Sequence, residues 1–285
     1  IWHECCLISP ASNWGYYMSV FDMTIDGANG GRGRVTNAIA MASRRTGMDF
    51  GYLLGQAKIE SSLNPTARAT TSSATGLYQF IDQSWLAVVH NHGAQYGLGW
   101  AADAIQQGSN GRYFVADPDM RKQILDLRKH PETASVMAAE HASDNKDYLE
   151  ARMGRQMESA DLYLAHFLGV GGASKFLRGM EQSPHAAAAS LFPAAAQANR
   201  SIFYDRQGNA RSFAEIRQLF ADKLAKGTQM AMNGSAKESR YAPATIRKCP
   251  EGSSTAPPSS WFEDSVNGNA SQVSVPGWSA STVWL

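Results

Sequence analysis

The chain has 285 residues, 44% of them hydrophobic, and its 26 basic and 25 acidic residues give a formal net charge of +1. This length suits one medium-sized globular domain with tails. The balanced charge gives no overall electrostatic attraction for nucleic acid, and no apolar run reaches the roughly 20 residues of a membrane-spanning helix. We therefore expect neither a nucleic-acid partner nor a transmembrane segment.

Residues 1–33 contain little that a core could bury and end in the glycine-rich stretch from Asp26 to Gly33, so we expect a flexible lead-in. Residues 1–17 lack the basic start and continuous apolar stretch of a secretory signal. Met18 is a candidate start, which would make the preceding residues translated upstream sequence. The GANGGRGR segment does not indicate a phosphate loop, because no strand is expected before it and no GKS or GKT follows.

Helical periodicity and helix-start signals extend over residues 34–227, which predicts an all-α domain. Helix starts are expected at Asp49, at Asp82 and at Asp117, where Pro118 follows at the first helical position. Further helices are expected over Pro131 to Met153, Glu158 to Leu168 and Ser212 to Lys226, and an alanine-rich stretch should break at Pro193.

Residues 228–285 are rich in Ser, Gly, Pro and Asn and predict a low-complexity, disordered tail. The aromatic residues of this tail leave open a short docking segment; they are Trp261, Phe262, Trp278 and Trp284. The three cysteines, Cys5, Cys6 and Cys249, form neither a disulfide framework nor a zinc-binding spacing.

Glu60 is the most informative residue. Leu53, Ala57 and Glu60 share one helical face, so the carboxylate lies on the inward stripe near the end of its helix. Burial and the negative end of the helix would both raise its pKa, as a general acid for glycosidic bonds requires. From periodicity alone, a capping or ion-pairing role is equally compatible.

The stretch KIESSLNP, followed after a polar loop by ATGLYQF, resembles the ES and GLMQ motifs of the SLT-type lytic transglycosylases, a lysozyme-like family. The resemblance covers about Val35 to Leu177 and implies a lysozyme-like fold. It makes Glu60 the single catalytic acid and base, and Ser61 the residue that orients the acid or the substrate. The GLYQ loop would line the glycan groove, with Tyr78 and Gln79 as lining residues, although Tyr78 could equally be a core aromatic residue. Gly76 would be needed where the backbone approaches the sugar or turns sharply.

The family's third motif, AYNAG, is echoed in YLAHFLG, where Ala165 and Gly169 are kept while His166 and Phe167 stand at the Tyr and Asn positions. This departure leaves Tyr163 or His166 as candidate substrate-binding substitutes. A histidine on an apolar helix is also commonly a core residue.

Glu140 could supply a second carboxylate, since it shares a helical face with Met137 and His141, or could be a solvated helix residue. Asn145 could likewise face the groove or the solvent. The sequence has no HExxH motif, no convincing cluster of histidine and carboxylate, and no cofactor motif. We therefore expect neither a metal nor a cofactor.

The resemblance implies a carbon–oxygen lyase that cleaves the β-1,4 bond between N-acetylmuramic acid and N-acetylglucosamine and leaves 1,6-anhydro ends. Its partner would be peptidoglycan glycan strands in the periplasm or cell envelope, with an envelope-spanning machine or a phage virion as further candidates and no export route indicated. The first alternative is a hydrolytic muramidase of the same fold, with Glu140 or an Asp within residues 70–90 or 140–150 activating water. The second is a non-catalytic glycan-binding component of a virion or envelope assembly.

Overall fold

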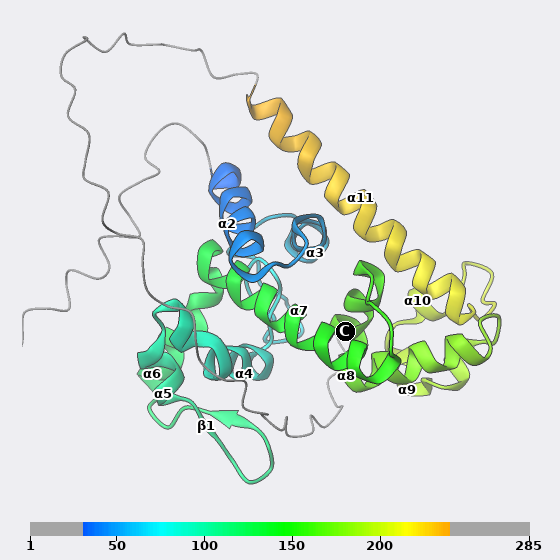
Figure 1. Cartoon of the computed structure of the whole chain (residues 1–285), viewed down its shortest axis with the longest axis horizontal. Helices are drawn as coiled ribbons and strands as arrows, with labels where there is room; N and C mark the ends of the chain where they lie inside the picture. The colour runs from blue at the N-terminus through cyan, green and yellow to red at the C-terminus, as the bar shows by residue number, and fades with distance from the viewer. Residues whose placement is uncertain (1–30, 240–285) are drawn as a thin grey trace, which may run out of the picture.

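The computed structural model describes residues 31–239, and this part of the chain is mostly helical (Figure 1). Its α-helices are α2 (Gly31–Thr46), α3 (Phe50–Ser61), α4 (Asp82–His92), α5 (Gly99–Ala104), α6 (Pro118–Asp126), α7 (Pro131–Met153), α8 (Ser159–Gln182), α9 (Pro193–Ala198), α10 (Arg200–Phe203) and α11 (Phe213–Ser239). Short 3-10 helices are η1 (Gly93–Tyr96), η2 (Leu127–Lys129) and η3 (Ala188–Ser190).

One small sheet departs from the all-α expectation. Strands β1 (Gln106–Gln107) and β2 (Tyr113–Phe114) form an antiparallel hairpin. The side-chain amide of Gln83 on α4 holds this hairpin, donating to the carbonyl of Tyr113 at 2.8 Å and accepting from its N–H at 3.0 Å. Strands this short have no readable alternation, so sequence periodicity does not reveal them.

Two predicted helix starts are confirmed. The Asp49 side chain accepts a hydrogen bond from the backbone N–H of Tyr52 at 2.7 Å. Asp117 accepts one from Met120 at 2.8 Å, and Pro118 occupies the first turn of α6. Each carboxylate satisfies a backbone donor that the helix itself leaves without a partner.

The predicted cap at Asp82 is wrong. Helix α4 begins at Asp82 itself, after Ile81, which makes no side-chain capping bond. The Asp82 carboxylate instead accepts hydrogen bonds from Arg121 at 2.6 Å and Arg128 at 3.0 Å. Two cations from distant sequence thus outcompete the local backbone for this carboxylate.

The predicted helix from Pro131 to Met153 is confirmed as α7, and Pro193 begins α9 as the expected break requires. Helix α8 starts after Glu158, also as expected, but continues beyond Leu168. Gly169 interrupts it with φ 71° and ψ 157°, which glycine adopts without a Cβ clash. Helical backbone then resumes to the end of α8.

Both boundaries of the folded region lie outside the expected ones. Helix α2 begins at Gly31, inside the expected lead-in of residues 1–33, and Val35 in its second turn is buried. Helix α11 continues to Ser239, well into the expected tail of residues 228–285. In α11, the bond of Thr228 to Gly51 and the burial of Ala231 are tertiary contacts beyond residue 227 that composition alone does not reveal.

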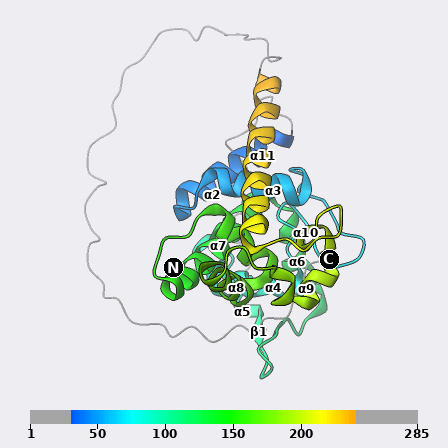
Figure 2. The ribbon, with the colours of Figure 1, turned by 90° about the vertical axis from the view of Figure 1, so that its right-hand side faces the viewer.

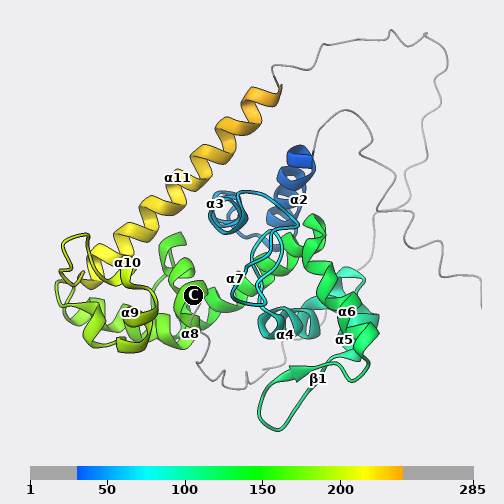
Figure 3. The ribbon, with the colours of Figure 1, turned by 180° about the vertical axis from the view of Figure 1, so that it is seen from behind.

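Helix α11 is held against α3 by a close approach of the two backbones. Gly55 and Gly227 lie at the crossing, where a Cβ built on Gly227 would stand 3.0 Å from the Gly55 carbonyl oxygen. The Thr228 hydroxyl also donates to the carbonyl of Gly51 at 2.7 Å. Figure 2 shows α11 crossing α3, and from behind α3 and the loop after it lie between α11 and α7 (Figure 3).

A buried carboxylate joins the base of α11 to the start of α8. Asp161 is fully buried and accepts hydrogen bonds from Arg155 at 2.9 Å and from Arg217 of α11 at 2.7 Å. These cations lower its pKa against the opposing effect of burial. Paired in this way, the buried charge fixes α8 relative to α11.

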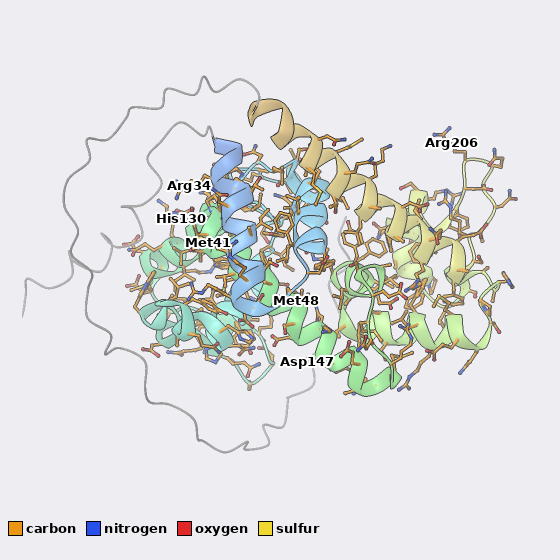
Figure 4. The ribbon with its side chains drawn as sticks, turned by 45° about the horizontal axis from the view of Figure 1, so that its top comes forward. Arg34, Met41, Met48, His130, Asp147 and Arg206 are labelled. Carbon is orange, nitrogen blue, oxygen red and sulfur yellow. The ribbon has the colours of Figure 1, made fainter. Side chains whose placement is uncertain are left out.

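A second helix pair, α2 and α7, forms the other side of the domain. The Arg34 guanidinium binds Glu132 at the start of α7, with Nε 2.8 Å from Oε1. Arg34 and Met41 lie along α2, and Arg206 lies at the opposite end of the molecule (Figure 4). The core is thus continuous from α2 to α11.

The three cysteines, Met18 and the aromatic residues of the tail lie outside the described residues. Among the helices within residues 31–239, none combines the length and apolar character needed to cross a membrane.

Replacing Gly55 with alanine should destabilise the protein, because the added Cβ would meet Thr228 Oγ1 at 2.6 Å and the Leu224 carbonyl oxygen at 2.9 Å. We expect a loss of about 2 kcal/mol in the free energy of unfolding, measured by urea denaturation. The control is Gly99→Ala in α5, where no atom lies within 4 Å of the new Cβ. Equal stability losses in the two variants would contradict the close crossing.

Candidate active site

Glu60 lies at the last turn of α3, where its helix leaves the core. Leu53 and Ala57 on the same face are fully buried, as their spacing predicts, while the Glu60 side chain keeps 18% of its surface exposed. Ser62 and Leu63 then adopt positive φ angles of 55° and 66°, which turns the chain sharply. The carboxylate is therefore held by a buried helix yet reaches solvent.

Ser61 physically joins the first two motifs. Its hydroxyl oxygen lies within hydrogen-bond distance of two carbonyl oxygens, that of Ala57 at 3.1 Å and that of Leu77 at 2.8 Å. The second contact fixes the GLYQ loop beside the end of α3. In this structure Ser61 acts on the loop, which leaves its expected role toward acid or substrate as an indirect one.

Gly76 is required by a close approach of backbone to backbone. Its φ is +87°, and a Cβ at this position would stand 2.0 Å from the carbonyl oxygen of Arg128. Of the two reasons expected for a glycine here, the structure shows the sharp turn, and the close neighbour is the Arg128 backbone. A larger residue would push the GLYQ loop away from η2.

Arg128 organises the same loop and is a residue that sequence reasoning missed. Its buried guanidinium donates to the carbonyls of Ser73 at 3.0 Å and Phe80 at 2.9 Å, and to Asp82 at 3.0 Å. It thus satisfies carbonyls on both sides of the GLYQ loop. An arginine more than forty residues away carries no local signal of this role.

Two further residues of the GLYQ motif, Tyr78 and Gln79, point into the protein. Tyr78 is 1% exposed and lies in the core, so the expectation that it lines the glycan groove is not met. The Gln79 side-chain amide donates to the carbonyls of Ala67 at 3.2 Å and Gly76 at 2.9 Å, which braces the loop from within. Asn145 on α7 is also buried, at 8% exposure.

Two side chains of α8 contact the Glu60 carboxylate. The Tyr163 hydroxyl donates to Oε1 at 3.0 Å, and His166 Nε2 lies 3.3 Å from the same oxygen. Their spacing of three residues places them on one face of the helix. The structure therefore brings both candidates from the third motif to Glu60, and His166 is more than a core histidine.

The expectation of a raised Glu60 pKa is wrong. Burial is the largest influence and does raise the pKa. The hydrogen bond and charge of His166, the Tyr163 hydroxyl and the ammonium of Lys223 on α11 together outweigh it and lower the pKa below its ordinary value. Periodicity reports burial and the helix end, but it does not show which donors other helices supply.

Gln56 completes the site one turn before Glu60 on α3. It is only 4% exposed, and its amide nitrogen lies 3.2 Å from Nδ1 of His166. The two ring nitrogens of His166 therefore face two residues of the same helix, Gln56 and Glu60. Gln56 lies outside the recognised motifs, and only its i, i+4 spacing to Glu60 could have drawn attention to it.

Glu140 belongs to a different cluster. It accepts a hydrogen bond from the Tyr96 hydroxyl, and its second oxygen lies 3.5 Å from Nδ1 of His92. His92 Nε2 in turn lies 2.9 Å from Asp144. Burial and the bond to Glu140 raise the pKa of Tyr96 to about 12. The structure thus engages Glu140 with η1 and α4, and does not make it a simple solvated residue.

His141 lies on α7 close enough to feel the charges of both His166 and His92. Its ring meets that of Phe80, the residue after the GLYQ motif, edge to face at 5.9 Å. Burial, followed by the charge of His166, lowers the pKa of His141 to about 4. His141 is therefore neutral over most of the pH range in which histidines usually titrate.

Within residues 31–239, no group of three or more His, Cys, Asp or Glu side chains could hold a metal ion. No family model matches the chain. Any function assigned to the protein therefore depends on the geometry of its own residues.

Replacing Gly76 with alanine should displace the GLYQ loop. We expect a loss of about 3 kcal/mol or more in unfolding free energy, because the positive φ and the contact with Arg128 both disfavour a Cβ. Gly97→Ala is the matched control, with a similar φ of +76° and no atom within 4 Å. It should cost about 1 kcal/mol. Equal losses in a thermal melt would exclude the close approach.

His141 should make stability depend on pH. Its folded pKa of about 4 lies below the ordinary 6.5, so its contribution is full above pH 6.5 and is lost as the pH falls toward 4. Over this window we expect the wild type to lose about 2 kcal/mol more than His141→Gln in urea denaturation. Parallel stability curves for the two proteins would contradict a neutral His141.

Proposed function

We propose that the protein is a peptidoglycan lytic transglycosylase with a lysozyme-like catalytic domain and Glu60 as its acid and base. The observation that carries this proposal is the convergence of three motifs on one partly exposed carboxylate. Ser61 ties the end of α3 to the GLYQ loop, and Tyr163 and His166 of the altered third motif contact Glu60 from α8. A purely structural carboxylate would not require this arrangement at the end of a helix.

In the proposed reaction, protonated Glu60 gives its proton to the glycosidic oxygen as the bond from N-acetylmuramic acid to N-acetylglucosamine breaks. The resulting carboxylate then removes the proton of the muramic C6 hydroxyl. That oxygen bonds to the anomeric carbon and closes the 1,6-anhydro ring, so Glu60 ends the cycle protonated. One carboxyl group suffices, whereas the usual hydrolytic routes employ two. The substrate places the activity in the periplasm or cell envelope.

Tyr163 and the covering glycan assist the reaction without taking part in proton transfer. The Tyr163 hydroxyl fixes one carboxylate oxygen, which leaves the second available for the glycan. A bound glycan would cover the exposed part of Glu60, and the loss of water would favour the protonated form needed for the first step. Low exposure in the free protein makes this change small in area, so the glycan need only close over one edge of the carboxylate.

The decisive experiment is digestion of purified peptidoglycan with the wild type and with Glu60→Gln, followed by mass spectrometry of the products. We expect muropeptides with 1,6-anhydro ends from the wild type and a loss of at least about a thousandfold in rate with Glu60→Gln. Circular dichroism should show that the variant keeps its helical content, since glutamine retains the shape of the side chain.

Glu140→Gln is the matched control, because Glu140 is a second partly buried glutamate bonded to a tyrosine. It should retain most of the activity. Reducing muramic ends, together with inactivity of Glu140→Gln, would replace the transglycosylase proposal with a muramidase. Wall binding without soluble fragments would instead indicate a non-catalytic glycan-binding protein.

A further inference from the structure

The pair formed by His166 and Glu60 has a third member whose hydrogen bonding is incomplete. Gln56 is more than nine-tenths buried, and its Oε1 atom has no hydrogen-bond partner among residues 31–239, while its Nε2 atom faces His166 Nδ1 at 3.2 Å. A buried acceptor without a partner is costly, and such atoms often mark a functional constraint. This one is adjacent to the ring that contacts the proposed acid.

The geometry connects the orientation of the Gln56 amide to the charge of His166. When Nδ1 carries no proton, it accepts from the Gln56 amide nitrogen, and Nε2–H faces Glu60. When the ring is an imidazolium, Nδ1–H needs an acceptor. A half-turn of the nearly symmetric amide would supply Oε1 for that bond without changing the packed volume.

Resting on the proposed function, we propose that Gln56 is a positioning residue: it holds the His166 imidazolium against Glu60, so that the two side chains together store the proton delivered to the glycan. In this state Glu60 is a carboxylate and His166 carries the proton on Nε2. As the glycan covers the site, that proton moves from Nε2 to the Glu60 carboxylate, which then gives a proton to the glycosidic oxygen. Proton number is conserved, because Glu60 later recovers a proton from the C6 hydroxyl and returns it to His166.

Four other ionisable groups lie close to the pair: two tyrosines, a histidine and a lysine. Tyr52 on α3 and Tyr163 on α8 have pKa values raised by burial and by the Glu60 charge, so both stay neutral. His141 on α7 has its pKa lowered to about 4 and is neutral as well. The ammonium of Lys223 on α11 contributes a positive charge that favours the Glu60 carboxylate.

The experiment compares Gln56→Leu with Gln56→Glu in the full chain. Leucine removes the acceptor for Nδ1–H and should move the titration midpoint of His166, followed by NMR of its ring nitrogens, to lower pH by about 1 unit. Glutamate provides a permanent acceptor and should move it to higher pH by a similar amount. The alkaline limb of kcat/KM for soluble glycan strands should move in the same two directions.

Gln83→Leu is the control, since its amide holds the hairpin and should not move either measurement. If leucine prevents folding, judged by circular dichroism, Gln56→Met takes its place. Opposite shifts for the acidic and apolar variants would support the proposal, because a merely structural role moves neither midpoint. Unchanged midpoints overturn it even where glycan cleavage is observed. Absence of cleavage refutes the proposed function, yet the NMR titration still decides whether Gln56 controls His166.

Discussion

The arrangement depends on a carboxylate that ends a buried helix and takes its hydrogen-bond donors from another helix. Glu60 is carried outward by α3, whose inner face is fully buried, and Tyr163 and His166 of α8 supply the donors. This requires α3 and α8 to be fixed relative to one another. Helix α11 achieves this, because it contacts both: at Gly55 through a close crossing, and at Asp161 through a buried ion pair.

A small number of contacts likewise fixes the loop after α3. The Ser61 hydroxyl binds the loop at the carbonyl of Leu77. The Arg128 guanidinium binds the carbonyls of Ser73 and Phe80, which precede and follow the GLYQ residues. Gly76 allows the Arg128 backbone to come this close. All four GLYQ residues therefore serve the shape of the loop: Gly76 permits the turn, Leu77 and Tyr78 are core side chains, and Gln79 braces the loop from within.

Local patterns foretold much of the fold. The caps at Asp49 and Asp117 and the span of α7 depend on interactions between residues close in sequence, so local sequence patterns predict them. The misplaced boundaries, by contrast, depend on tertiary contacts: α11 continues past Gly227 because that glycine packs on α3. Arg128 was missed for the same reason, since its partners lie some fifty residues away. The helical face and the motif resemblance together drew attention to Glu60, whereas Gln56 lies outside the motifs and its significance depends on His166.

The incorrect sign of the Glu60 pKa has the largest consequence for mechanism. A carboxyl group whose pKa is raised by burial alone would hold its own proton, as the helical position of Glu60 suggests. The donors from α8 instead favour the ionised form in the free protein. A general acid must still be protonated when the bond breaks. In the mechanism we propose, the proton comes from a neighbour or from a pKa shift on glycan binding, and His166 is the neighbour 3.3 Å away that could supply it. In the proposed mechanism, the contact that favours the ionised form of Glu60 thus also places a proton donor beside it.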